Sequence, residues 1–430
     1  MIFLLSATEN MAPVDVLKNI GYVIVAILAL MLMIIIHESG HYLAGKMLKF
    51  RIDEFSIGFG PAIFKKRNKK NGEVFSIRPI PIGGFCAFHG EDQEGEDAVN
   101  PYVNKDVASN GEKGILSYII DDTDPVATNQ STASAQIADG KEGVLSYLNA
   151  QKKGPYFNDQ PAWKRLIVLF SGAFFNFLSS ILFITIMFTT FGQILPGVSE
   201  TYAITGQEHA FQSGDVILAV DGKQVNILMP EDIASVFNTK EDSAVFKILR
   251  DGKVIEVNAS KYSYIHTEIE KDEGGNEVIK TEERFDYGIA SNEYTAVRVK
   301  LNFSLAFSRA FGYAFFVVFK ILASLGALIT GKIGLESAGG TITVVKTIAD
   351  MSAQGFHAFM YTISIISANL AVMNLLPIPA LDGSRMVFTF IEMIFRKPVP
   401  RKVEGIIHTV GLVILMLLVV FLDVFHLVNG

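Results

Sequence analysis

The sequence predicts a polytopic α-helical membrane protein with four transmembrane helices and a β-rich domain outside the membrane. Half of its 430 residues are hydrophobic, only 19% are charged, and the mean hydropathy is +0.35. The apolar residues concentrate in four segments of about 20 residues, the length at which a helix crosses a bilayer. Between the second and third segments, residues 198–262 show short β-branched runs bounded by glycine turns, which is typical of strands.

The four predicted spans cover residues 21–43, 166–191, 359–376 and 407–424. Lysines and arginines follow the first span between residues 46 and 70, and the third span between residues 385 and 402. Because basic loops stay in the cytoplasm, both of these segments are expected there. Both termini, and the long segment from 192 to 355, are then expected outside the cytoplasm.

Residues 311–329 form a fifth apolar stretch, interrupted only by Lys320. If this stretch crossed the membrane, the third span would run in the opposite direction and the basic cluster at 396–402 would face outside. We therefore expect an amphipathic helix that lies on the outer surface or packs against the helix bundle. A fifth span is the alternative.

Two polar regions complete the outline. In residues 198–262, Asp221-Gly222 and Asp251-Gly252 predict tight turns between strands, and a helix is expected from Pro230 to Phe237. Residues 91–153 open with EDQEGED and are expected to form a polar cytoplasmic insert. The pentapeptides GILSY and GVLSY at 114–118 and 143–147 are either two related short helices or a coincidence.

His37, Glu38 and His41 form an HExxH pattern at the end of the first apolar segment. Positions i and i+4 of a helix share one face, so both imidazoles can bind one metal ion while Glu38 lies beside a metal-bound water. Ionisable side chains at membrane depth are costly, which makes them functional candidates. The pattern predicts a zinc site at which Glu38 moves protons during peptide hydrolysis.

A catalytic zinc site normally has three protein ligands, and the best third ligand is Asp382. This residue lies in NLLPIPALDG (374–383), directly after the third apolar segment. The first and third spans both run towards the cytoplasm, and their polar ends are expected at one depth. His89, in the glycine-rich segment GGFCAFHGED, is the competing ligand, although a loop histidine exposed to solvent is the simpler interpretation.

Two asparagines are expected near the same site. Asn176 follows Gly172 on the second span, and Asn374 ends the third. An amide inside the membrane can hold the backbone of an extended substrate, or it can join two helices. Both interpretations stay open for the asparagines, whereas helix packing is favoured for Gly172.

Together these motifs resemble the site-2 protease family of intramembrane zinc metalloproteases, in its bacterial RseP-like branch. The resemblance rests on HESGH in the first span, GxxxN in the second, NxxPxPxLDG in the third and SGDVILAVDGKQV (213–225) between the last two. It implies that His37, His41 and Asp382 bind Zn²⁺ and that Glu38 is the catalytic base. It also implies a single extracytoplasmic PDZ-like domain that acts as a size filter for substrates, with peptide binding as a possible role. A plain anchoring domain with an empty peptide groove is the alternative.

The resemblance further implies a membrane-reentrant β-hairpin containing PIGGF (81–85), in which Gly83, Gly84 and Phe85 pair with a substrate strand near Asn176 and Asn374. A helical substrate must unwind before its carbonyl can be attacked, and strand addition satisfies its exposed backbone. The expected substrates are transmembrane segments of single-pass proteins, such as anti-sigma factors or remnant signal peptides. The expected location is the bacterial cytoplasmic (inner) membrane, with both termini extracytoplasmic.

The expected organisation follows the chain. Its parts are 1–50 (N-terminus and first span), 51–90 (reentrant hairpin region on the cytoplasmic side), 91–160 (polar insert), 161–192 (second span), 193–265 (PDZ-like domain), 266–354 (extracytoplasmic connector with the amphipathic helix), 355–384 (third span with LDG) and 385–430 (cytoplasmic loop and fourth span).

Composition and motif logic also exclude other classes of protein. The net charge of −7 argues against a nucleic-acid partner, and the single cysteine, Cys86, has an apolar setting that predicts a packed thiol. The alternative function is a PDZ-containing membrane scaffold with a non-catalytic metal site. The intact Glu38 argues against it, since a structural site needs no base. A transporter is disfavoured because the sequence lacks inverted repeats.

Overall fold

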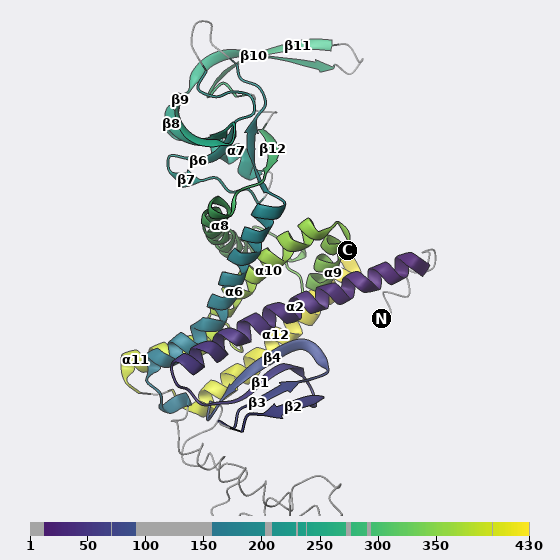
Figure 1. Cartoon of the computed structure of the whole chain (residues 1–430), viewed down its shortest axis with the longest axis vertical. Helices are drawn as coiled ribbons and strands as arrows, with labels where there is room; N and C mark the ends of the chain where they lie inside the picture. The colour runs from purple at the N-terminus through teal and green to yellow at the C-terminus, as the bar shows by residue number, and fades with distance from the viewer. Residues whose placement is uncertain are drawn as a thin grey trace, which may run out of the picture. The chain divides into compact units, whose positions relative to one another are not determined.

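The computed structural model describes residues 13–69, 71–91, 157–202, 209–228, 231–237, 239–271, 277–289, 294–397 and 399–429 (Figure 1). The insert predicted at 91–153, with both pentapeptides, lies outside these residues except at Glu91. The chain divides into two compact units. The first comprises Met1–Ser179 and Ser324–Gly430, and the second comprises Ser180–Ala323.

Each predicted span coincides with one long helix, which begins several residues before the span; the second and third spans run one residue past the helix end. The long helices are α2 (Pro13–Met47), α6 (Ala162–Thr190), α8 (Phe303–Ile329), α10 (Phe356–Leu375) and α12 (Arg401–Asn429). Shorter helices are η1 (Phe157–Asp159), η3 (Leu335–Ser337), α9 (Thr341–Ala353) and α11 (Asp382–Phe395). Within the described ranges, five helices are long and apolar enough to cross a membrane, so the predicted number of four stays a prediction.

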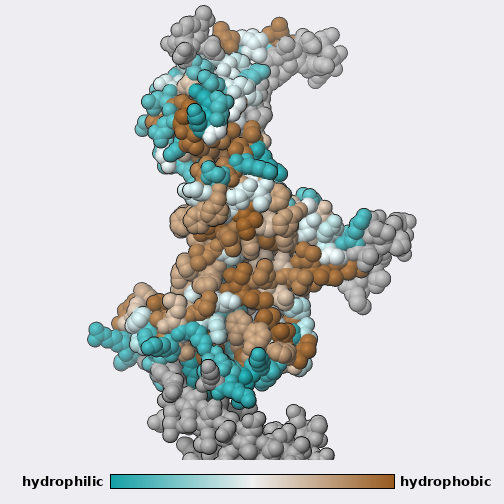
Figure 2. All heavy atoms as spheres, in the orientation of Figure 1, coloured by the Kyte–Doolittle hydropathy of each residue, from teal (hydrophilic) through white to brown (hydrophobic). Residues whose placement is uncertain are grey.

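The helices of the first unit expose apolar side chains that water would not favour. On α12, Val413, Ile414 and Leu417 are each more than half exposed, and Ile24 and Leu28 of α2 are similar. Figure 2 shows hydrophobic residues along α2, while hydrophilic residues gather around α11 and the sheet of this unit. Apolar side chains exposed along whole helices indicate contact with lipid. The chain is an integral membrane protein.

A four-stranded sheet follows α2. Its strands are β1 (Ile52–Phe59), β2 (Phe64–Arg67), β3 (Val74–Ile77) and β4 (Ile80–Phe88), in the order β2-β3-β1-β4. β1 pairs with β3 in parallel and with β4 in antiparallel orientation. The prediction of a simple hairpin was therefore wrong in this detail, because β4 passes β3 and pairs with β1 instead. As a result, Pro81–Phe85 lie on an edge strand.

Aromatic packing holds this sheet against the end of α2. The rings of Phe50, Phe88 and Phe157 lie 5.2–5.7 Å apart and are all buried. Gly45 of α2 provides the space, since a Cβ there would collide with the Phe88 ring. The Phe157 N–H donates to the carbonyl of His89, so the described residues on either side of the insert meet beside this core.

The second unit contains a separate β-rich module. Its strands are β5 (Gln193–Val198), β6 (Val216–Val220), β7 (Lys223–Gln224), β8 (Ser243–Arg250), β9 (Lys253–Ser260), β10 (Tyr262–Lys271), β11 (Glu277–Asp286) and β12 (Tyr294–Val299), with α7 at Glu231–Phe237. The main sheet has the order β12-β5-β6-β8-β9, with β7 paired to β6, and β10 pairs with β11 as a separate ribbon.

The tight turns predicted in this module are confirmed. Asp221 and Asp251 have φ of 47° and 48°, and the glycine after each is also left-handed, as a two-residue hairpin turn requires. The core contains the buried residues Leu195, Ile217, Phe246, Ile248 and Tyr287. The domain boundary expected at residue 265 falls short of the sheet, because β12 closes it by pairing with β5. The hydrophobic pattern of the sequence does not show that β12, a strand far along the chain, pairs with the open edge of β5.

Helix α8 has two different faces. Its inner face is tied to the module through Arg309, Tyr313 and Lys320, whose nitrogen and oxygen atoms bond to acceptors in the same unit. Its outer face exposes phenylalanines at every fourth position: Phe303, Phe307, Phe311, Phe315 and Phe319. An exposed apolar stripe opposite a polar attachment suits a helix on the membrane surface. The length and apolar composition of α8 also suit a fifth span, so both interpretations stay open.

Candidate metal centre

Helix α2 carries the first two donors of a metal centre. His37 and His41 are one helical turn apart and buried, with ring centroids 4.8 Å apart and planes at 82°. Their Nε2 atoms lie 3.1 Å from each other. The i and i+4 spacing therefore brings both imidazoles to one point beside the helix, as the sequence predicts.

Asp382 completes the cluster. Its Oδ2 lies 3.0 Å from His37 Nε2 and 3.2 Å from His41 Nε2. Ligands around a tetrahedral zinc ion lie about 3.3 Å from one another. Among the described residues these three are the group whose donor atoms could hold a metal, and Oδ2 has no hydrogen-bond partner there. The donors therefore fit a zinc ion.

The loop between α10 and α11 brings Asp382 to this position. Pro377 and Pro379 cannot continue the helix, so α10 ends at Leu375. Ala380 then adopts φ of 75°, which reverses the chain before α11 begins at Asp382. Gly383 is needed for space, because a Cβ there would lie 2.6 Å from the Leu375 carbonyl. The LDG motif thus follows a tight turn and begins α11, and the ligand Asp382 is the first residue of that helix.

Outer contacts orient both imidazoles. His41 Nδ1 lies 2.8 Å from the carbonyl oxygen of Val168 on α6, so it carries the proton and leaves Nε2 as a lone-pair donor. The side-chain amide of Asn176 lies 3.4 Å from His37 Nδ1, and its Oδ1 is without a partner in the described part of the chain. The oxygen and nitrogen of the Asn176 amide are assigned from their hydrogen bonds. Rotating this amide by half a turn lets His37 Nδ1–H donate to Oδ1. Asn176 then orients His37.

Gly172 and Gly40 let α6 approach α2 closely. A Cβ at Gly172 would collide with His41 Nε2 and lie 2.7 Å from His37 Cε1. A Cβ at Gly40 would collide with the carbonyl of Ser171. Helix packing was the favoured interpretation of Gly172, and the structure adds that this packing occurs against the two imidazoles.

Strand β4 lies beside Glu38. Gly84 is so close that a Cβ there would lie 3.5 Å from Glu38 Cγ, and the backbone N–H of Cys86 donates to the Glu38 carboxylate. Gly83 has φ of 151° and packs beneath the Phe59 ring. The Phe85 ring is stacked by Arg78 at 5.1 Å. Because side chains alternate along a strand, Phe85 faces away from Glu38 while Gly84 faces it.

Two predicted residues lie apart from the donor cluster. His89 Nδ1 pairs with Asp53 Oδ2 at 2.7 Å, so the competing ligand is committed to a partner on β1. Asn374 lies in the last turn of α10 and is partly buried. Within the described ranges, the side chains of the three donors contact one another, the Val168 carbonyl and the Asn176 amide.

Cys86 behaves as its apolar setting predicts. Burial raises the pKa of its thiol well above the ordinary range, and the carboxylates of Glu38 and Glu91 raise it further. The thiol is thus protonated at neutral pH and is a poor nucleophile. It serves as a packing residue on β4.

The model of peptidase family M50 matches residues 25–418, which include all three donors and Glu38. The chain belongs to peptidase family M50. This is the site-2 protease family, and the protein is a zinc metalloendopeptidase embedded in the membrane, with membrane proteins as substrates.

Several relatives match this M50 protein along nearly all of its length. A Fusobacterium nucleatum protein named a zinc metalloprotease is 28% identical over 93% of this chain and 97% of its own. A Staphylococcus aureus protein with the same description is 28% identical over 94% of this chain and 97% of its own. The regulator of sigma-W protease RasP of Bacillus subtilis is 27% identical over 90% of this chain and 93% of its own.

Three contributors to the M50 site were missed in the sequence. Val168 and Cys86 act through backbone atoms, which no residue pattern reveals. The third, His408, binds the loop that precedes Asp382. Its signal was available, because it is a histidine inside the apolar run of the last helix.

Proposed function

We propose that this protein is an intramembrane endopeptidase that cleaves transmembrane segments of single-pass membrane proteins. The observation that carries the proposal is the convergence of His37, His41 and Asp382 beside Glu38, at the ends of helices whose surfaces are apolar. A scaffold with a structural metal site is less well supported, because a structural site has no use for a carboxylate beside its ligands.

In this proposal His37, His41 and Asp382 hold the zinc ion. When bound, zinc supplies the Lewis acidity that polarises a peptide carbonyl and makes a water molecule more acidic. Glu38 accepts the proton of the attacking water and returns it to the leaving amine. The Cys86 N–H keeps the Glu38 carboxylate in place during both transfers.

Substrate is proposed to bind along β4 as an added strand. β4 is an edge strand, since its one partner among the described strands is β1. Its Gly84 lies beside Glu38 without a side chain in between, so a peptide on this edge can bring its carbonyl to the base. Gly83 and Phe85 shape the strand from the opposite side. Asn374 is proposed to bind the peptide backbone, whereas Asn176 acts mainly through His37.

The proposed topology has four spans and both termini outside the cytoplasm of a bacterial inner membrane. It is supported by the basic segments after the first and third spans. It is also supported by α8, whose phenylalanine stripe suits the membrane surface and whose other face is attached to the β-rich module. In Figure 1, the view runs almost along the axis of α8. The part of α6 that belongs to the same unit, Ser180–Thr190, is seen from the side, so the two helices run in different directions there.

The β-rich module is proposed to be a single PDZ-like domain that binds peptide ends of substrates. Its glycine turns and short α7 beside a β-sheet support this assignment. The name of the Bacillus subtilis relative links that protein to sigma-W regulation. By analogy, we propose that the substrates of this chain include anti-sigma factors or remnant signal peptides, cut in regulated intramembrane proteolysis.

Replacing Glu38 by glutamine tests the proposal. Glu38→Gln should lower cleavage of a reconstituted model transmembrane substrate by about 10³-fold, because general acid–base catalysis is lost. Zinc content should stay unchanged. The matched control is Glu256→Gln on β9, whose side chain is 66% exposed. Full cleavage by Glu38→Gln would leave the scaffold function as the better explanation.

A further inference from the structure

Helix α12 contacts the loop that delivers Asp382 at two points. The N–H of Ala380 donates to Nδ1 of His408, with the two nitrogens 3.1 Å apart. One turn further along, Gly411 touches Pro379 so closely that a Cβ would collide with Pro379 Cβ and lie 3.0 Å from Cγ. Pro379 and Ala380 directly precede Leu381 and Asp382, and both are held by one face of α12.

The first contact supports a backbone conformation that needs support. Ala380 has φ of 75°, a left-handed value that costs free energy in a residue with a Cβ. Its neighbours bond within the loop, as Ile378 N–H donates to Leu376 O and Leu381 N–H to Ile378 O. The Ala380 N–H instead depends on a side chain from another helix.

The hydrogen bond also determines the tautomer of His408. Since Nδ1 accepts from a backbone N–H, it carries no proton, and the proton is on Nε2. Nε2 faces Glu404 Oε1, one turn earlier on α12, at 4.0 Å. The Phe388 ring of α11 packs on the imidazole at 5.8 Å. The ring is therefore held in one orientation by residues of two helices.

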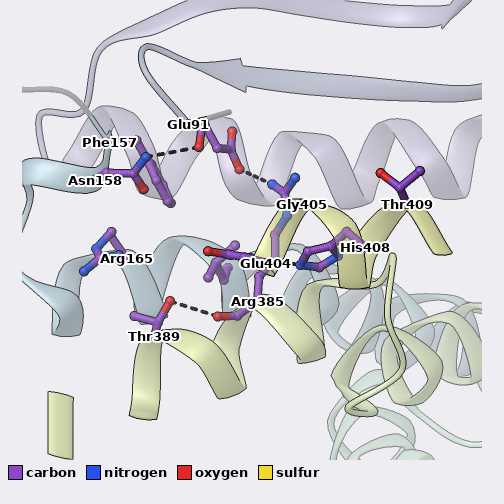
Figure 3. Close-up of a pocket in the computed structure, with 11 residues that line it drawn as sticks. Glu91, Phe157, Asn158, Arg165, Arg385, Thr389, Glu404, Gly405, His408 and Thr409 are labelled. Atoms are coloured by element: carbon purple, nitrogen blue, oxygen red, sulfur yellow. Dashed lines mark hydrogen bonds and ion pairs between the residues drawn. The ribbon is translucent and has the colours of Figure 1, made fainter. Parts of the chain in front are cut away.

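Figure 3 shows His408 and Glu404 on the wall of a polar cavity that also contains Arg385, one turn after Asp382. The cavity has a volume of about 240 Å³. Arg385 pairs with Glu91, at the start of the insert. The turn and the first part of α11 are thus held from both sides, by His408 at Ala380 and by Glu91 at Arg385.

We propose that His408 is a positioning residue of the metal centre. It fixes the left-handed turn at Ala380 and thereby places the Asp382 carboxylate against His37 and His41. The proposal rests on Asp382 being a zinc ligand, as proposed above. His408 itself touches neither the metal nor the substrate, so its effect acts through the backbone of the loop.

Zinc affinity of the purified full chain, measured by competition with a chromogenic chelator, is the decisive readout. His408→Leu removes the acceptor and should weaken zinc binding 10- to 100-fold, the usual effect of losing an outer partner of a ligand. It should lower kcat and leave KM for a model substrate within about twofold. His408→Asn retains an oxygen in the place of Nδ1 and should recover zinc affinity to within about threefold of the native protein.

Two further variants separate this role from general packing. Gly411→Ala pushes on Pro379 while keeping His408, and should also weaken zinc binding. His426→Leu alters a histidine near the end of the same helix and should leave zinc affinity unchanged. Unchanged affinity in His408→Leu, or equal losses in His408→Leu and His408→Asn, would overturn the proposal. If Asp382→Ala also bound zinc normally, the ligand assignment itself would be wrong.

Discussion

Two buried polar clusters, one in each unit, have opposite hydrogen-bonding patterns. In the second unit Arg309 is 5% exposed and donates to three acceptors, Gln193 Oε1, Leu218 O and Val225 O, at 2.6–2.9 Å. In the first unit three acceptor atoms, from His37, His41 and Asp382, point at one another.

The difference distinguishes a buried polar group that serves the fold from one that binds a ligand. A buried charged group that the protein itself supplies with hydrogen-bond partners needs no ligand. Acceptors that converge without a donor are unfavourable until a cation binds, so they indicate a ligand. The Arg309 cluster fastens α8 to its sheet, and the histidine–aspartate cluster is built for zinc.

The largest expected effect comes from removing a converging acceptor. Asp382→Ala should abolish stoichiometric zinc binding and lower substrate cleavage by about 10³-fold or more, because two histidines alone make a weak site. Metal analysis after dialysis and a cleavage assay would measure both. Retained zinc with full cleavage would show that the convergence is accidental.

In the opposite cluster, Arg309→Met should destabilise the module while leaving zinc affinity unchanged. Three buried acceptors would lose their donor, at a cost of about 3 kcal/mol. Hydrogen exchange of the β6 amides in the full-length protein would measure this loss. Arg298→Met is the control, since Arg298 is exposed on β12. A large change in zinc affinity would break the distinction between the clusters.

A smaller effect is expected from filling the space beside the imidazoles. Gly172→Ala places a methyl group against His41 Nε2 and His37 Cε1, so zinc affinity should fall by about tenfold. Gly21→Ala on α2 meets no atom within 4 Å and should have no effect. Chelator competition on both variants gives the comparison. Equal affinities would mean that α6 moves aside freely.

The smallest effect concerns the strand beside Glu38. Because burial raises the thiol pKa, less of Cys86 is thiolate at any given pH than in a free cysteine. Alkylation at pH 8 should therefore be about tenfold slower than for a model thiol, and it should keep increasing above the free pKa of about 8.5. Mass spectrometry at several pH values would follow the reaction. Fast labelling at pH 7 would place the strand in an open, polar setting.

Several structural details escaped sequence reasoning for one physical reason, which is that they depend on partners remote in the chain. The four-stranded sheet arises because β4 selects β1 as its partner, and β12 closes the second sheet beyond residue 265. The orientation of His37 by Asn176 appears only when α6 packs on α2. Phe85 and Gly84, adjacent in sequence, differ in role because strand pairing sends them to opposite faces.

The sequence by itself determined what local geometry controls. Helical spacing put His37 and His41 on one face beside Glu38, the Asp-Gly pairs specified the hairpin turns, and the prolines ended α10 before Asp382. Only the tertiary structure decided how Asp382 meets the histidines, which strand edge lies beside Glu38 and which side chain supports Ala380. Spacing within one helix follows from fixed backbone dihedrals, whereas contacts between distant segments depend on how whole surfaces pack.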